Sequence, residues 1–170
     1  QGSAHAYHYG ETERGRGTLP NSKTRYEIGS ITKTFTATLL AQAICDGKVG
    51  LDDDVRKYLA EPFPTLEFEG RPIRLRDLAN HTSRLPTLPG DVGSQPGARP
   101  LTPERDYDRQ RFFDALRNFR MPGPSGERLE YSNWGVALLG LSLEQVYGRP
   151  YEDLLARFIT TPLGMNETSY

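Results

Sequence analysis

Two short motifs place side chains that could carry out acyl transfer. The first is Ser30-Ile31-Thr32-Lys33, where a hydroxyl and an amine stand three residues apart. On a helix this spacing brings Ser30 and Lys33 onto neighbouring faces, near enough to share a proton. A helix N-terminus also presents unpaired N–H groups and a positive dipole end, which stabilise an alkoxide or an oxyanion. Catalysis by this pair is one interpretation, and a capping serine followed by a solvated lysine is the other.

The second motif, Tyr131-Ser132-Asn133, lies between a stretch rich in glycine and proline and a long apolar segment. A phenol can take up and return a proton, and a carboxamide can hold an amide-bearing substrate. The alternative is a turn in which Ser132 or Asn133 caps a helix and Tyr131 packs as an ordinary aromatic residue. Each motif alone is weak support for an enzyme.

Other reactive side chains have structural interpretations. His5 and His8 stand three residues apart on an expected strand, so they lie on opposite faces and cannot bind one metal ion. The acidic run Asp52-Asp53-Asp54 precedes a short helical pattern, where capping explains it. Cys45 lies in an apolar helical segment, which predicts a small buried side chain. No metal site is predicted.

Composition excludes several classes of function. The 170 residues carry 21 basic and 22 acidic side chains, for a net charge of -1. Such a balance gives no broad attraction to nucleic acid or anionic lipid, so no nucleic-acid partner is expected. No apolar run approaches the roughly 20 residues that cross a bilayer, so no membrane-spanning segment is expected. The single cysteine excludes an internal disulfide.

Strands followed by helices are expected to position the two motifs. Alternating side chains predict strands over 4–9 and 25–28, in a hairpin-like start. Two segments, 30–45 and 134–146, are apolar on nearly every helical face, which predicts buried helices and a buried Lys33 suited to accept a proton. Shorter helices are expected at 52–59, 71–80, 102–119 and 150–161, with Asp52 and Thr102 as the N-caps of the first and third.

Together the motifs resemble those of serine β-lactamases and penicillin-binding proteins, above all the class C β-lactamase and DD-peptidase branch. Residues 27–36 are similar to the active-serine segment of that family. The resemblance runs over essentially the whole chain, because further motifs follow in the family's order: Asp46-Gly47-Lys48-Val49, Leu51-Asp52-Asp53, residues 75–83, Tyr131-Ser132-Asn133 and Pro162-Leu163-Gly164-Met165.

The resemblance implies a role for each matching residue. Ser30 corresponds to the acylated nucleophile and Lys33 to its proton acceptor or relay. Tyr131 corresponds to the general base and then acid, and Asn133 to a ligand of the substrate's amide side chain. Ser132 matches a position usually held by a small residue and receives no role. The resemblance implies neither a cofactor nor a metal.

The chain also departs from the family pattern. Arg84 replaces the glycine usual after the His-Thr-Ser run, where His81 resembles a structural histidine, and Asp54 replaces a proline. No Lys-Thr-Gly or His-Thr-Gly triplet follows Tyr131. We therefore expect residues 1–170 to be an incomplete domain, inactive alone, with sheet strands over 1–29 and a mainly helical region over 30–170. The missing C-terminal part or a second copy would cover the sheet edge.

The implied fold class is α+β, β-lactamase/transpeptidase-like. The implied activity is acyl hydrolysis through a Ser30 acyl-enzyme, on a small-molecule or peptidoglycan-type substrate: a β-lactam or a D-alanyl-D-alanine peptide. The alternatives are a carboxylesterase or D-amino-acid amidase of the same family, because the pocket and not the catalytic pair selects the substrate, or a non-catalytic penicillin-binding sensor module. The resemblance implies a periplasmic or extracellular location.

Overall fold

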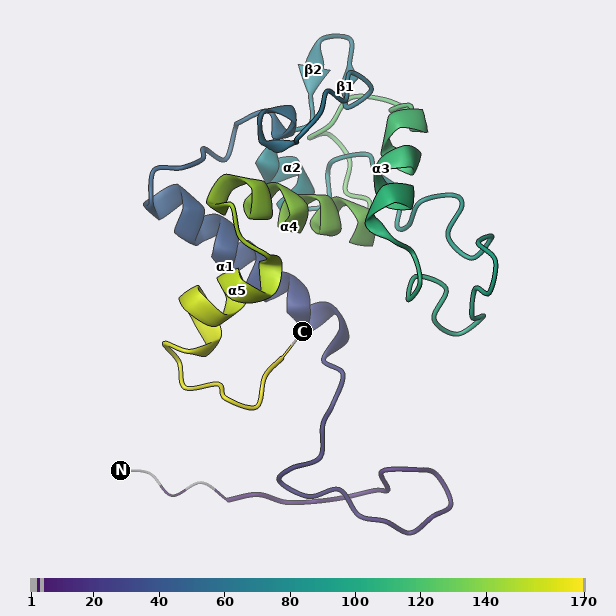
Figure 1. The fold of residues 1–170 in the computed structure, drawn as a ribbon, viewed down its shortest axis with the longest axis vertical. Helices are drawn as coiled ribbons and strands as arrows, with labels where there is room; N and C mark the ends of the chain where they lie inside the picture. The colour runs from purple at the N-terminus through teal and green to yellow at the C-terminus, as the bar shows by residue number, and fades with distance from the viewer. Residues whose placement is uncertain (1–2, 4, 170) are drawn as a thin grey trace. The chain divides into compact units, whose positions relative to one another are not determined.

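The structure is a computed structural model that describes residue 3 and residues 5–169. Two compact units divide the chain, Gln1–Thr32 and Lys33–Tyr170. Figure 1 shows the elements along the chain. Each unit is described by itself below.

The described residues of the first unit form turns and extended backbone, with a single 3-10 turn at Gly29–Ile31. The strands expected at 4–9 and 25–28 are not formed there, Ala4 itself lying outside the described residues. Nearly every described side chain of this unit is exposed, Pro20 being buried. A lone pair of strands with no apolar face to pack is marginal in water. The described residues of this unit therefore present no sheet edge for a partner to cover.

A small antiparallel sheet lies instead in the second unit. Strand β1 (Glu67–Phe68) pairs with β2 (Arg71–Pro72). The two residues between them, Glu69 and Gly70, have φ of 49° and 76°. Positive φ at both central residues is the geometry of a tight hairpin turn whose twist matches that of the strands. Two-residue strands are too short for side-chain alternation, so sequence periodicity could not predict them.

Helices make up most of the regular secondary structure of the second unit. The α-helices are α1 (Thr32–Cys45), α2 (Leu75–Ala79), α3 (Arg109–Asn118), α4 (Asn133–Tyr147) and α5 (Tyr151–Leu155). A 3-10 turn spans Val55–Tyr58, and a π-helical turn at Ala156–Thr160 continues α5. Helix α4 runs through the middle of the unit, with α2 and α5 packed against it (Figure 1).

Side-chain caps set where these helices begin. Asp54 accepts the N–H of Arg56 and caps the turn at Val55–Tyr58, so the expectation that Asp52 is the cap is wrong. Asp108 accepts the N–H of Arg111 at 2.8 Å and caps α3, which therefore starts six residues later than Thr102 as the N-cap would place it. Residues 103–106 form turns instead.

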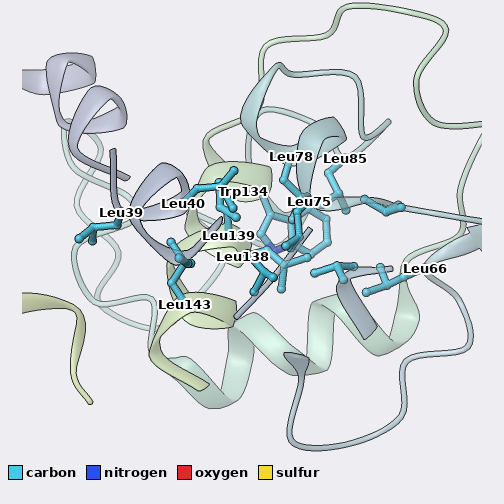
Figure 2. Close-up of a cluster of buried hydrophobic side chains, with 14 of the residues drawn as sticks. Leu39, Leu40, Leu66, Leu75, Leu78, Leu85, Trp134, Leu138, Leu139 and Leu143 are labelled. Atoms are coloured by element: carbon cyan, nitrogen blue, oxygen red, sulfur yellow. The ribbon is translucent and has the colours of Figure 1, made fainter. Parts of the chain in front are cut away.

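The core of the second unit is built around α4. Its buried residues pack with leucines of α1 and α2, as Figure 2 shows: Leu39, Leu40, Leu75, Leu78, Trp134, Leu138, Leu139 and Leu143. Only one stripe of α1 is buried, at the i, i+3, i+4 and i+7 positions from Thr36 to Ala43. Cys45 is exposed, so the predictions that it is buried and that α1 is buried on all faces are wrong. Small residues such as Ala37 and Ala41 lie on the exposed face, where they leave little apolar surface in water.

Candidate active site

Ser30 lies in the 3-10 turn that ends the first unit. The N–H of Ile31 donates to the carbonyl of Ile28 at 3.2 Å, and that of Thr32 to the carbonyls of Gly29 and Ser30. Gly29 has a φ of 53°, in the left-handed region that a residue with a side chain rarely adopts. Ser30 is exposed and lies two residues before Thr32, the first residue of α1. Its hydroxyl therefore stands at the N-terminal end of a helical run.

Lys33 and Tyr131 come together in the second unit. Lys33 lies in the first turn of α1 and is half-buried, less than the sequence predicted. Its Nζ stands 4.9 Å from the centroid of the Tyr131 ring. Tyr131 directly precedes Ser132, the N-cap of α4, and is 44% exposed. An ammonium over an aromatic face is attracted by the ring quadrupole.

His81, in the segment 75–83, contacts both Tyr131 and Ser132. Its ring centroid lies 4.5 Å from that of Tyr131, and its Nδ1 accepts the backbone N–H of Ser132 at 3.1 Å. Burial lowers the pKa of His81 below its ordinary value, and the positive charge of Lys33 lowers it further. The sequence predicted a structural role for His81 but carried no sign of its contact with Tyr131, because nothing in the local pattern connects residues so far apart.

Ser132 and Asn133 anchor the start of α4. The Ser132 hydroxyl donates to the carbonyl of Pro86 and accepts the N–H of Gly135, each at 2.8 Å. This confirms the capping interpretation for Ser132. A Cβ at position 135 would lie 3.1 Å from the Ser83 hydroxyl, so a glycine is needed for this close approach. Asn133 is half-buried, and its N–H donates to the carbonyl of Thr87 at 3.0 Å.

Arg84 stabilises the approach to Tyr131. Its backbone has a φ of 67°, in the left-handed region that favours glycine. Its Nη1 lies 3.0 Å from the Glu130 carboxylate, and the N–H of Glu130 donates to the carbonyl of His81 at 2.7 Å. The Arg84 side chain is only 13% exposed. The replacement of glycine thus adds an ion pair next to Tyr131, which the sequence gave no reason to expect.

Among the residues that the structure describes, no group of three or more histidine, cysteine or acidic side chains could hold a metal ion. A search of those same residues finds no helix with the length and apolar character needed to cross a bilayer.

Comparison with known proteins supports one family over the whole length. The family model described as beta-lactamase matches residues 1–170. The D-alanyl-D-alanine-carboxypeptidase/endopeptidase AmpH of Escherichia coli (strain K12) is 33% identical over 95% of this chain and 41% of its own length. A beta-lactamase of Pseudomonas fluorescens is 28% identical over 98% of this chain and 42% of its own. The chain thus spans less than half the length of these relatives.

Solved structures agree with this result. A beta-lactamase/D-alanine carboxypeptidase from Yersinia pestis, complexed with citrate, superposes with a TM-score of 0.83 at 34% identity, covering 95% of this chain and 45% of the other. A D-stereospecific amidohydrolase from Streptomyces sp. has a TM-score of 0.69 at 33% identity, over 86% of this chain and 45% of the other. The predicted β-lactamase/transpeptidase-like fold is confirmed. The chain belongs to the β-lactamase family.

Proposed function

We propose that this chain carries the catalytic serine, lysine and tyrosine of a serine acyl-hydrolase. Ser30 Oγ attacks the substrate carbonyl, and its proton passes to the Tyr131 phenolate, directly or relayed by the Lys33 ammonium. The resulting tetrahedral intermediate expels its leaving group, which takes a proton from the Tyr131 phenol. Water then hydrolyses the Ser30 ester: Tyr131 accepts a proton from the water and returns it to the Ser30 oxygen as that oxygen leaves.

One observation carries the proposal. Lys33 Nζ stands over the ring of Tyr131, at 4.9 Å from its centroid, although the two residues come from separate motifs. The mechanism proposed here needs the Lys33 and Tyr131 side chains next to each other, and this contact places them so. Ser30 precedes Lys33 by three residues, the spacing that would complete the set on a helix.

The substrate we propose is a D-alanyl peptide or a β-lactam, with Asn133 binding its amide side chain. AmpH, named as a D-alanyl-D-alanine-carboxypeptidase/endopeptidase, is 33% identical. The Yersinia pestis protein, named as a beta-lactamase/D-alanine carboxypeptidase, is 34% identical, and the beta-lactamase of Pseudomonas fluorescens is 28% identical. These names support both substrates. The similarity to a D-stereospecific amidohydrolase, at 33% identity, supports a D-amino-acid amidase as the second candidate.

Mass spectrometry of the full-length protein with a penicillin separates these functions. An adduct that forms and turns over supports a β-lactamase, and a lasting adduct supports a peptidase or a sensor module. Release of D-alanine from a D-alanyl-D-alanine peptide then identifies the peptidase. An absent adduct, with cleavage of a D-amino-acid amide or a simple ester that Ser30→Ala abolishes, identifies the amidase or the esterase. The exposed serine in Ser22→Ala is the matched control.

We further propose that the 170 residues alone are inactive, because no Lys- or His-Thr-Gly triplet follows Tyr131 to bind a substrate carboxylate. Hydrolysis of a chromogenic cephalosporin by the 170-residue chain would contradict this proposal. A periplasmic or extracellular location also stays our prediction, to be tested by fractionating cells that express the full-length protein.

A further inference from the structure

His81 holds two consecutive residues of the second motif at once. Its ring packs on the Tyr131 ring at 4.5 Å between centroids, and its Nδ1 accepts the Ser132 N–H at 3.1 Å. Only a neutral imidazole has a nitrogen that can accept, because both ring nitrogens carry protons in the charged form. The hydrogen bond to Ser132 therefore exists only while Nδ1 is unprotonated.

The backbone on both sides fixes where this ring stands. His81 has a φ of 63°, a left-handed conformation that histidine, asparagine and aspartate adopt more readily than most residues. Its carbonyl accepts the N–H of Glu130 at 2.7 Å, and the next N–H, that of Thr82, donates to the carbonyl of Asp77 at 2.9 Å. The ring is thus held from α2 and from the segment that leads to Tyr131.

The charges around His81 oppose its protonation. Lys33, on α1, already places a positive charge against the same Tyr131 ring. Two acidic residues whose backbone bonds to His81 or Thr82 have carboxylates engaged elsewhere. The Glu130 carboxylate pairs with Arg84 and Arg128. The Asp77 carboxylate accepts the N–H of Arg74 and the hydroxyl of Thr82. Charging the imidazole would add a second cation beside Lys33 and remove the acceptor of the Ser132 N–H.

We infer that neutral His81 is the positioning residue of Tyr131, and that protonating His81 displaces Tyr131 and suppresses acylation at acid pH. This inference rests on the proposed function, in which Tyr131 transfers the proton. His81 itself touches no reacting atom in this account. It acts by holding the phenol of Tyr131 under the Lys33 ammonium.

The kinetic test compares variants of position 81 in the full-length protein. The rate of acylation by a fluorescent penicillin is measured from pH 4 to pH 8. Asparagine tolerates the left-handed backbone, offers an amide oxygen to the Ser132 N–H and does not titrate. We expect His81→Ala to lower the rate at neutral pH by about tenfold, the effect of losing one hydrogen bond. We expect His81→Asn to recover most of that rate and to lose the acid decline of the wild type. His5→Asn is the matched control and should behave as the wild type.

A second measurement does not depend on activity. Residues 1–170 hold three histidines, and the imidazole signal of His81 in NMR is assigned by its loss in His81→Asn. As His81 protonates, we expect the Ser132 amide and the Tyr131 ring signals to shift with the same midpoint. Lys33→Met should raise the pKa of His81, because it removes a repelling charge.

The two measurements distinguish failure of the positioning role of His81 from failure of the proposed acyl-hydrolase function. If the signals of Ser132 and Tyr131 do not shift as His81 titrates, the positioning role is overturned, whatever the protein hydrolyses. An unchanged acid decline in His81→Asn would overturn it as well. Coupled NMR titrations in a protein that no penicillin, peptide, amide or ester acylates would uphold the positioning role and reject the proposed function instead.

Discussion

Lys33 acts on two neighbouring rings through a single charge. Its ammonium lies 4.9 Å from the centre of the Tyr131 ring and lowers the pKa of His81. A positive charge disfavours an imidazolium, so it favours the neutral form of His81 that accepts the Ser132 N–H. At the scale of the residue, one ammonium therefore contacts the Tyr131 ring and also favours neutral His81.

Removal of this charge should suppress acylation without unfolding the protein. We predict that Lys33→Met lowers the rate of acylation by a penicillin by at least about 100-fold, the contribution of one positioned proton-transfer group. The methionine retains the packing of the half-buried stem, so the thermal midpoint should stay within a few degrees. The control is Lys48→Met, which removes the contact of Lys48 Nζ with Tyr147 at 5.3 Å. Equal acylation rates in both variants would disprove the proton-transfer role.

Arg84 combines an unfavourable backbone with a favourable ion pair. Its φ of 67° costs a residue with a side chain about 1 kcal/mol more than glycine. We predict that the free energy of unfolding of Arg84→Gly exceeds that of Arg84→Ala by about this amount. Both variants lose the ion pair with Glu130, and only the glycine variant is free of the backbone strain. Urea denaturation at neutral pH measures the difference. A variant with alanine as stable as the one with glycine would show that the backbone at position 84 carries no strain.

At the scale of the element, the start of helix α3 depends on which of two possible caps precedes the packed apolar face. The Thr-Pro-Glu sequence at 102–104 has a favourable cap, proline and acid, yet the helix begins at Arg109 behind Asp108. The hydrophobic face predicted for this helix, from Phe112 to Phe119, starts only after Asp108, so packing supports a helix there and not before. Both caps are compatible with the sequence, and the core selects one.

We predict that Asp108→Ala lowers the free energy of unfolding by about 1 kcal/mol, because the Arg111 N–H loses its acceptor. Thr102→Ala, on the exposed turn before it, should change the free energy by less than about 0.5 kcal/mol. Urea unfolding followed by circular dichroism gives both values. The reverse order would mean that α3 starts at Thr102 in solution.

Helix α1 shows how far periodicity alone reaches. The sequence predicts its span well, and its buried stripe from Thr36 to Ala43 is present. The exposed alanines and Cys45 cannot be told from buried ones by type, because small residues are found on either side. The first-unit strands fail for a related reason: alternation in 5–9 shows that a strand could form, but forming it requires a packed partner.

At the scale of the whole molecule, the candidate site joins residues from distant parts of the chain. Lys33, Tyr131 and Asn133 could be predicted because local motifs carry them. The contacts of His81 with Tyr131 and of Arg84 with Glu130 could not, because they depend on how α2, α4 and the loops between them pack. Sequence therefore predicts the candidate reacting groups, and the fold adds the contacts around them.

The central claim is that Ser30 is the residue that becomes acylated. The most direct measurement is a peptide map by tandem mass spectrometry of the full-length protein, quenched after incubation with a penicillin. The account predicts that the added mass lies on Ser30 and is absent from Ser30→Ala, while Ser22→Ala acylates as the wild type does. An adduct on any other residue, or one that persists in Ser30→Ala, would contradict it.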